Sequence, residues 1–307
     1  MGNLRGRLGR RLRDGILHEI LSALRGSEEK ALLEGAEPVR QAQSQTLRIM
    51  TYNIHRWAGS DHRVDLERTL AIIRASDADV VALNEVIHPV TQGAHTHDYL
   101  GELAGRLGMA FHFGPSGWVD YGPEWHGPQG NALLSRYPLE NAKSILLPRL
   151  PTTKQRVLLG ARLAAGPARG LTAFVTHLDH ALEVTRLIQV QGVLAELAQH
   201  GAHFIAGDFN TPGFHGRHAR HLSPPVLRLK RTAGYEDAFH AMGEGTGRTF
   251  PARAPVFRVD FVFFPKAWAS GVCRAHAFGS DPVHHASDHR PTVVEWTWPD
   301  GADRPAI

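Results

Sequence analysis

From Leu47 onward, segments with two different hydrophobic periodicities alternate along the chain. Apolar residues at every second position, or in short unbroken runs, predict strands at residues 47–54, 79–86, 131–135, 156–163, 171–178, 203–210, 258–264 and 291–298. Apolar residues spaced three or four apart predict helices around residues 66–73, 99–107 and 187–197. Several strands follow one another without a helix between them. The pattern therefore predicts an α/β protein with substantial antiparallel pairing and not a purely parallel sheet.

Residues 1–46 have a different pattern, which predicts a basic amphipathic helical extension and a linker ahead of one domain at residues 47–307. Apolar residues recur at every fourth position between Leu4 and Leu24, five arginines lie within residues 1–13, and residues 35–46 are polar. Such a helix suits an anionic membrane surface, which makes residues 4–24 a candidate peripheral membrane contact. Gly6, Gly9 and Gly15 each weaken a helix by about 1 kcal/mol. They favour the other interpretation, a helix that packs on the protein body or on a second subunit.

Composition places the chain among soluble globular proteins. Of its 307 residues 42% are hydrophobic and 21% are charged, and its one cysteine, Cys273, excludes an intrachain disulfide framework. No apolar run approaches the roughly 20 residues that span a bilayer, and no signal-peptide pattern is evident at the N-terminus. We expect a cytoplasmic protein, with peripheral attachment to a membrane as the alternative.

The charge distribution argues against long duplex nucleic acid as the main ligand. The formal net charge is +4, and residues 1–46 carry 8 Lys/Arg against 6 Asp/Glu, so about half of the excess lies in the extension. Binding to a phosphate backbone needs concentrated positive charge, which the nearly neutral body at residues 47–307 lacks.

Polar side chains that could carry chemistry stand at the ends of several predicted strands. A buried carboxylate is costly unless a metal, a cation or hydrogen bonds compensate it. One such residue is commonly a cap or a turn, but a repeated occurrence predicts that the strand ends converge on a hard cation and a phosphate. The residues concerned are Asn53, Glu85, His177, Asp208, Asn210, Asp260, Asp288 and His289.

Oxygen donors of this kind favour Mg²⁺ or Mn²⁺ over zinc. Mg²⁺ keeps several waters and shares its coordination shell with substrate phosphate. This chemistry indicates phosphoryl transfer to water, in which the metal neutralises phosphate oxygens and a carboxylate activates the attacking water.

The ordered segments TYNIH, LNEV, GNALLSRYPL, a strand led by QR, VTHLDH, GDFNTP, RVDFVFF and SDHRP resemble the endonuclease/exonuclease/phosphatase superfamily, whose fold is that of pancreatic deoxyribonuclease I. Each segment alone is weak, but the set occurs in the family's order over residues 47–297. The resemblance implies a four-layer α/β sandwich, with two packed mixed β-sheets flanked by helices, and a metal-dependent phosphoesterase.

The resemblance also implies roles for single residues. Glu85 would be the main metal ligand, and Asn53 and Asp288 would help to place the metal. Asp208 would orient or activate the nucleophilic water, and Asn210 would hold that water or a phosphate oxygen.

Histidines would complete this implied site. Asp260 would fix the ring of His289, which would contact the scissile phosphate. His177 would stabilise the phosphate or protonate the leaving group. Arg156 and Asn131 would contact substrate.

Two positions depart from the family's pattern: Asn84 stands where the family usually has glutamine, and Lys154-Gln155 precede Arg156 where an acid is common. No DNA-gripping insertion and no inositol-phosphatase or sphingomyelinase signature is apparent, so the substrate stays open among small-molecule, lipid-linked and nucleic-acid phosphoesters.

The primary hypothesis is therefore a Mg²⁺/Mn²⁺-dependent phosphoesterase that cleaves a phosphodiester or phosphomonoester by direct water attack. A nuclease acting on DNA or RNA is one alternative. A non-catalytic binding or scaffold module of the same fold is an alternative of another class, disfavoured because the candidate ligands are present. The sequence leaves the oligomeric state open.

Overall fold

The computed structural model describes residues 45–122, 125–213, 223–279 and 283–301. The predicted extension and linker at residues 1–46 lie outside this part of the chain, apart from residues 45 and 46. Among the described residues, no helix combines the length and apolar character needed to cross a bilayer.

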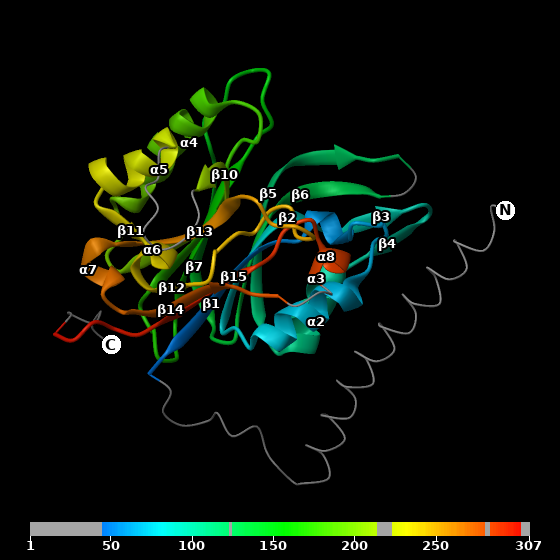
Figure 1. The fold of residues 1–307 in the computed structure, drawn as a ribbon. Coiled ribbons are helices and arrows are strands. Elements are labelled where there is room, and N and C mark those ends of the chain that lie inside the picture. Colours follow the sequence, from blue (N-terminus) through cyan, green and yellow to red (C-terminus); the bar gives the residue numbers. More distant parts are fainter. Residues whose placement is uncertain (1–44, 123–124, 214–222, 280–282, 302–307) are drawn as a thin grey trace, which may run out of the picture. The chain divides into compact units, whose positions relative to one another are not determined.

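Two mixed β-sheets form the centre of the domain (Figure 1). In the first sheet the order is β12 (Gly243–Glu244), β14 (Val272–Ala277), β15 (Thr292–Trp296), β1 (Leu47–Asn53), β2 (Val80–Ile87), β6 (His126–Ser135), β3 (Val90–Gln92) and β4 (His95–His97), and β5 (Ala110–Asp120) also pairs with β6. In the second sheet it is β11 (Tyr235–Asp237), β13 (Arg258–Pro265), β10 (His203–Gly213), β9 (Thr172–His177), β8 (Val157–Leu163) and β7 (Leu139–Leu146). The strand pairs β1–β2 and β9–β10 are parallel, and most others are antiparallel.

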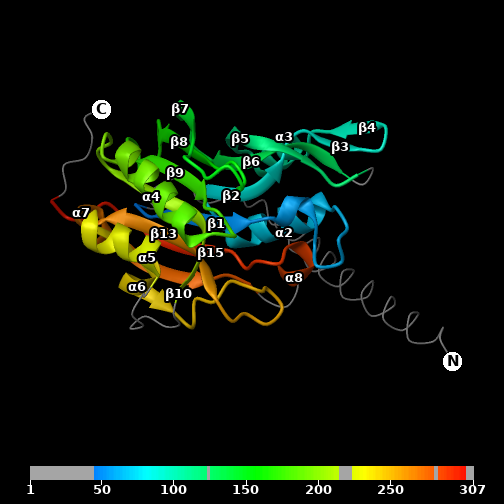
Figure 2. The ribbon, with the colours of Figure 1, turned by 90° about the horizontal axis from the view of Figure 1, so that it is seen from above.

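Helices cover both outer faces of this pair of sheets (Figure 2). On the side of the first sheet lie η1 (His55–Trp57), α2 (Leu66–Ser76), α3 (Tyr99–Leu107) and α8 (Val283–Ala286). On the side of the second sheet lie α4 (Glu183–Leu197) and α5 (Pro224–Leu227), which continues into the π-helical turn η2 (Arg228–Thr232). The short helices α6 (Ala238–Met242) and α7 (Lys266–Ala269) flank the ends of β11 and β13.

Three separate apolar clusters fill the spaces between four layers. One joins the first sheet to α2 and α3, a second lies between the two sheets, and a third joins the second sheet to α4 and α5. Strand β1 contributes to two of these clusters because successive side chains of a strand point to opposite faces of the sheet. Ile49 packs between the sheets, whereas Met50 and Tyr52 face the helices. The predicted four-layer sandwich of two mixed sheets is therefore confirmed, as are the strands and helices predicted from periodicity.

The topology brings distant segments to one edge. Because β1 runs parallel to β2 and β9 runs parallel to β10, their carboxyl ends lie together. The register pairs Asn53 with Asn84, and it pairs Asp208 with both His177 and Asp260. Side chains separated by up to about two hundred positions are thus neighbours at this edge.

Candidate active site

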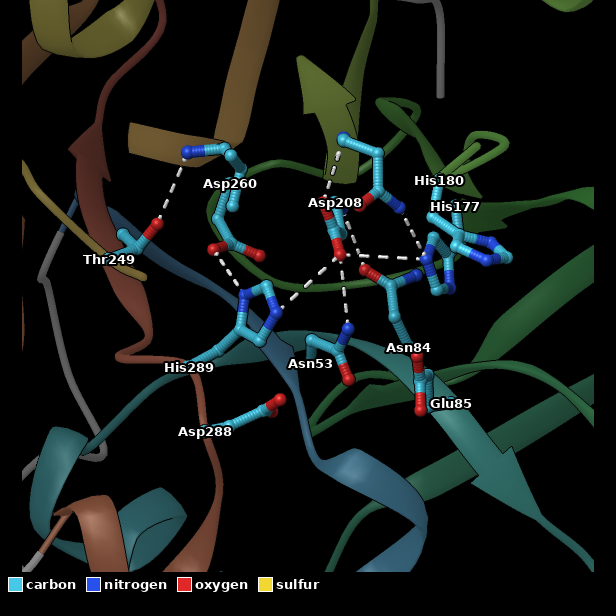
Figure 3. Close-up of polar contacts among 12 residues, drawn as sticks. Asn53, Asn84, Glu85, His177, His180, Asp208, Thr249, Asp260, Asp288 and His289 are labelled. Atoms are coloured by element: carbon cyan, nitrogen blue, oxygen red, sulfur yellow. Dashed lines mark hydrogen bonds and ion pairs between the residues drawn. The ribbon is translucent and has the colours of Figure 1, made fainter. Parts of the chain in front are cut away.

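Asp208 lies at the centre of the polar cluster at this strand edge (Figure 3). Its carboxylate accepts a hydrogen bond from Nδ2 of Asn53 at 3.0 Å and one from the backbone N–H of Asn210 at 2.8 Å. Its Oδ2 atom lies 3.5 Å from Nε2 of His177 and 3.8 Å from Nε2 of His289. Burial raises the pKa of Asp208 to about 7, with the charge of Asp260 adding to the effect and His289 opposing it.

Asp260 and His289 form a buried pair beside Asp208. Nδ1 of His289 donates to Oδ2 of Asp260 at 2.9 Å. Burial alone would lower the pKa of His289, but the carboxylates of Asp260 and Asp208 raise it to about 10. The backbone N–H of His289 donates to Ser287 Oγ at 3.1 Å, and that hydroxyl donates to the carbonyl oxygen of Asn53 at 2.6 Å. The imidazolium is therefore fixed in place between two carboxylates.

His177 faces Asp208 from the opposite side to His289. Nη1 of Arg156 lies 3.0 Å from Nδ1 of His177, and since a guanidinium can only donate, this nitrogen accepts. Nδ2 of Asn210 lies 2.8 Å from Nε2 of the same ring. Burial, followed by the charges of Arg156 and His289, lowers the pKa of His177 well below its usual value. His177 is therefore neutral near pH 7, in contrast to His289.

Glu85 carries a buried carboxylate oxygen that could bind a cation. Its Oε2 atom is buried and has no hydrogen-bond partner among the described residues. Nε of Arg56 lies 3.7 Å from this oxygen, and the Arg56 side chain also donates to the hydroxyl of Tyr121 at 2.9 Å. A buried carboxylate oxygen that accepts no hydrogen bond is costly, and a hard divalent cation at Glu85 would compensate it more fully than the ion pair with Arg56.

Figure 3 shows Asn53 with Asp288 and Glu85 on either side of it in this view. Asn53 Oδ1 accepts from the backbone N–H of His55 at 3.0 Å, and Nδ1 of His55 lies 3.9 Å from Oδ1 of Asp288. The Asp288 side chain is 36% exposed, which leaves its oxygens open to water or to an ion.

A second group of possible ligands, Asp208, Asp260 and His289, has donor atoms within 4.8 Å of one another. Here the protonated ring of His289 already supplies the positive charge, and both of its nitrogens carry protons that face the two carboxylates. A histidine that ligates a metal must be neutral at the coordinating nitrogen. Because Asp208 and Asp260 already face this imidazolium whereas Glu85 Oε2 accepts no hydrogen bond, we take the residues around Glu85 as the candidates for the cation.

Unusual backbone conformations direct two of these side chains. Glu85 has φ of 57° and Asn210 has φ of 48°, and both lie where the strand register shifts. A bulge turns a side chain away from the alternation of the strand, and a non-glycine residue in the left-handed region costs about 1–3 kcal/mol. Gly207 precedes Asp208 with φ of +148°, and a Cβ atom there would meet the carbonyl oxygen of Thr176 at 1.8 Å.

Asn131 and Arg156, predicted to contact substrate, line a small polar pocket with Glu85 and His177. Asn131 also has partners inside the protein: its Nδ2 donates to the carbonyl of Val157 at 2.9 Å, and its Oδ1 accepts from Asn84 at 2.9 Å. All ten predicted site residues lie at this edge, and their roles stay predictions.

Three further residues of this region, Asn84, Arg56 and Tyr121, lie outside the predicted set of site residues. The side chain of Asn84 accepts from the backbone N–H of Asp208 at 2.8 Å and donates to the carbonyl of Thr176 at 3.0 Å, which joins the two sheets beneath the site. Its position inside the apolar run VVALNEV was the available signal. Arg56 and Tyr121 had none, because neither lies in a recognisable pattern.

Known proteins resemble this chain in sequence and in fold. The chain is 28% identical over 265 residues to the uncharacterized protein YbhP of Escherichia coli K12. The aligned region covers 83% of this chain and 98% of YbhP.

Solved structures share the fold. The endonuclease/exonuclease/phosphatase of Beutenbergia cavernae has a TM-score of 0.64 and 24% identity, covering 83% of this chain and 72% of that one. The mannosyl-6-phosphatase of Bacteroides thetaiotaomicron has a TM-score of 0.62 and 14% identity, covering 81% and 98%. The human Nocturnin catalytic domain with bound sulfate has a TM-score of 0.60 and 18% identity, covering 84% and 96%.

A family profile, described as that of the Endonuclease/Exonuclease/phosphatase family, matches residues 50–289. This match spans most of the chain and includes the eight strand-end residues from Asn53 to His289, so it confirms the resemblance inferred from the sequence. The chain belongs to the Endonuclease/Exonuclease/phosphatase family.

Proposed function

We propose that this protein is a Mg²⁺- or Mn²⁺-dependent phosphoesterase that hydrolyses a phosphoester by direct attack of water. One observation carries the proposal: Asp208 lies within 3.8 Å of Nε2 atoms from a neutral and a protonated histidine, at the strand edge that also holds the orphaned carboxylate of Glu85. This arrangement supplies a base, a fixed positive charge and a cation ligand.

Asp208 is the candidate base. A carboxylate with a raised pKa accepts a proton from water more readily than an ordinary aspartate. The water oxygen would bond to phosphorus as the phosphorus–oxygen bond to the alcohol breaks. The proton of the attacking water would pass to Asp208, and the departing alkoxide would take a proton from bulk water. Asn210, whose backbone N–H holds Oδ1 of Asp208, would orient the same water through its side-chain amide.

Positive charge and hydrogen bonds would stabilise the phosphate as it accumulates negative charge. His289 provides a fixed imidazolium, held by Asp260, and Arg156 provides a buried guanidinium next to His177. Groups fixed in advance in a site of low polarity are effective because they need not reorganise during the reaction. The lowered pKa of His177 favours a role as a neutral hydrogen-bonding group over one as the acid for the leaving group.

Glu85, together with Asn53 and Asp288, would hold the cation. All three offer oxygen donors, which suit Mg²⁺ and Mn²⁺. Such a cation, when bound, acts as a Lewis acid that neutralises phosphate or leaving-group oxygens.

Two structural neighbours support a phosphoester or a related tetrahedral anion as ligand. One is named as a mannosyl-6-phosphatase, and another holds a sulfate anion. At sequence identities of 14% and 18%, these likenesses establish a shared fold, and the substrate of this chain has to be determined by experiment.

A substrate panel tests the proposal directly. The purified protein is assayed with an aryl phosphodiester, an aryl phosphomonoester and single-stranded and duplex nucleic acid, with Mg²⁺, Mn²⁺ or EDTA. We expect metal-dependent hydrolysis that Asp208→Ala and His289→Ala abolish. The matched controls, Asp300→Ala and His95→Ala, change exposed residues outside the site and should retain the rate.

Retained metal-dependent hydrolysis in both site variants would show that the reaction takes place elsewhere. If no member of the panel is hydrolysed and calorimetry with Mn²⁺ and inorganic phosphate shows no binding, the chain would instead be a non-catalytic module of this fold.

A further inference from the structure

Arg56 and Glu85 form an ion pair that is too long for a hydrogen bond. Nε of Arg56 lies 3.7 Å from Oε2 of Glu85. Both atoms are buried, and neither has a hydrogen-bond partner among the described residues. The two side chains are 20% and 21% exposed, so water screens the pair only in part. Two groups of opposite charge thus lie close together with their hydrogen-bonding capacity unused.

Other partners hold the guanidinium of Arg56 away from Glu85. Its Nη1 atom donates to the hydroxyl of Tyr121 at 2.9 Å, and the guanidinium carbon lies 4.8 Å from the centroid of the same ring. Its Nη2 atom contacts Nε2 of His55. Nδ1 of the His55 ring lies 3.1 Å from the carbonyl oxygen of Ala58 and donates to it, so in the neutral ring Nε2 is the acceptor for Arg56. Tyr121 and His55 therefore compete with Glu85 for the guanidinium.

The backbone that carries Arg56 has an unusual conformation. His55, Arg56 and Trp57 have φ of 46°, 61° and 67°, so three consecutive residues other than glycine lie in the left-handed region. Such a conformation is costly and persists only where its surroundings determine it. Here the fully buried Trp57 anchors the turn, because its Nε1 donates to the carbonyl of Ile87 at 2.8 Å. Ile87 and Glu85 belong to the same strand, β2, so the turn fixes the place of Arg56 relative to Glu85.

A cation bound at Glu85 would change the charge balance of this pair. In the metal-free protein the guanidinium of Arg56 partly neutralises the carboxylate of Glu85. A divalent cation at the carboxylate has the same sign of charge as Arg56, so the two positive charges would repel each other. Arg56 would then be a largely buried positive charge whose carboxylate is taken by the cation, and such a charge favours the binding of an anion.

We propose that Arg56 is an exchangeable counter-ion. It neutralises Glu85 while no cation is bound, and its charge becomes available to an anionic phosphate once a divalent cation occupies Glu85. The presence of a cation at Glu85 rests on the proposed function, whereas the competition between Arg56 and a cation follows from the contacts of Arg56. Two consequences follow: Arg56 weakens the binding of the metal alone, and it makes the metal and the phosphate bind cooperatively.

Metal binding, measured without turnover, tests the first consequence. Calorimetry of the EDTA-dialysed proteins with Mn²⁺ compares the unchanged protein with Arg56→Gln, Arg56→Lys, Tyr121→Phe and Arg48→Gln. Arg48 is the matched control, because its side chain is 24% exposed and pairs with Glu295 at the other end of β1. Arg56→Lys keeps the positive charge at the turn. Thermal unfolding of the same preparations shows that each variant is folded.

We expect Arg56→Gln to bind Mn²⁺ about tenfold more tightly than the unchanged protein, because the competing positive charge is gone. Arg56→Lys and Arg48→Gln should stay within about threefold of the unchanged protein, the first because it keeps the charge and the second because its charge is distant and screened. Tyr121→Phe should bind Mn²⁺ about threefold more weakly, because the freed Nη1 lets the guanidinium close on Glu85. Effects of opposite sign distinguish this role from a structural one, since damage to the site would weaken binding in both variants.

A second titration tests the coupling to the anion. Methylphosphonate is titrated into the unchanged protein and into Arg56→Gln, with and without Mn²⁺. Mn²⁺ should strengthen methylphosphonate binding in both proteins, through its own charge, but by about tenfold less in Arg56→Gln. The same factor should separate the two proteins when Mn²⁺ is titrated with and without methylphosphonate, because coupling between two ligands is reciprocal.

The outcomes separate this inference from the proposed function. Mn²⁺ binding that is unchanged or weaker in Arg56→Gln, or unchanged or tighter in Tyr121→Phe, overturns the role of Arg56 as a counter-ion. An equal effect of Mn²⁺ on methylphosphonate binding in the unchanged protein and in Arg56→Gln overturns the coupling to the anion. Absence of hydrolysis in the substrate panel, with these binding differences retained, would overturn the proposed reaction and leave the role of Arg56 in place.

Discussion

His289 and Asp260 share a hydrogen bond of 2.9 Å that is inaccessible from solvent, and this bond determines the charge at the centre of the site. The Asp260 carboxylate is fully buried, yet it faces a histidine whose pKa it raises, together with Asp208, to about 10. The ring therefore stays positive at neutral pH next to Asp208, where a phosphate would be held under the proposed function.

Asp260→Asn is expected to lower kcat by about 100-fold or more, because the ring of His289 would lose its fixed orientation and its charge. The fold should persist, since the ring can release its proton and leave no uncompensated buried charge. Steady-state kinetics and thermal unfolding of the same preparation measure the two effects.

Asp237 offers a matched control. It is also fully buried and forms an ion pair of 2.6 Å, but its partner is Arg258, which cannot release its proton. Asp237→Asn should lower the free energy of unfolding by about 3–5 kcal/mol and leave the rate of the folded fraction nearly intact. Equal losses of activity in the two variants would show that Asp260 acts only through stability.

The pH dependence of the rate should have two limbs. Asp208 must be deprotonated and His289 protonated, so at subsaturating metal the rate is expected to fall below about pH 7 and above about pH 10. Higher metal concentration should move the acid limb to lower pH, because a nearby cation favours the carboxylate. Asp260→Asn should move the basic limb to lower pH, since it removes the charge that raises the pKa of His289; a basic limb that stays in place in this variant would contradict the assignment.

Metal binding should depend on Glu85. Removal of its charge in Glu85→Gln is expected to raise the Mn²⁺ concentration for half-maximal activity by about 10- to 100-fold, with partial recovery of the rate at high metal concentration. Glu67→Gln is the control, because Glu67 is an exposed acid that pairs with Arg106 on α2 and α3. Calorimetry of the EDTA-dialysed proteins measures the affinity, and unchanged Mn²⁺ affinity in Glu85→Gln would place the cation elsewhere.

Periodicity and local motifs were sufficient to predict the four layers of the fold and most of the polar residues at the strand ends. Asp260 stands out because large apolar residues surround it in RVDFVFF, and Asp208 stands out in GDFN after an apolar run. In both cases the conflict between a charged residue and its buried surroundings is visible in the sequence.

The remaining parts depend on contacts that the sequence does not display. The left-handed backbone at Glu85 reverses the alternation expected for β2, so the strand pattern could not give the direction of its side chain. Phe250 and Phe257 line a pocket beside His289, but they lie in a hairpin with no periodicity, and two backbone hydrogen bonds between them bring them together. Asn84 lies in the first sheet and hydrogen-bonds the backbone of two strands of the second sheet. These contacts exist only once the two sheets pack, so the sequence does not display them.

Stability at acid pH should depend on His203, a buried histidine in β10 away from the site. Its Nδ1 atom lies 2.6 Å from the carbonyl oxygen of Gly201, and its Nε2 atom lies 2.5 Å from the hydroxyl of Tyr235. Burial lowers the pKa of His203 from 6.5 to about 4, although the hydrogen bond to Gly201 opposes this effect. The folded protein therefore holds this ring neutral where the unfolded chain would protonate it.

The sign of the effect follows from which state takes up the proton first. Between pH 6.5 and about 4 the unfolded chain binds more protons than the folded one at His203, so the free energy of unfolding decreases as the pH falls through this window. Over the whole window this one group lowers the free energy of unfolding by about 3 kcal/mol. Above pH 6.5 the ring is neutral in both states, so the destabilising effect is absent. Denaturant unfolding at pH 7.5 and pH 4.5 measures this loss of stability. The loss should be smaller in His203→Gln than in the unchanged protein, because an amide does not titrate. His95→Gln changes an exposed histidine and should lose as much stability as the unchanged protein. Equal losses in all three proteins would mean that the ring of His203 is protonated as easily in the folded state as in the unfolded chain.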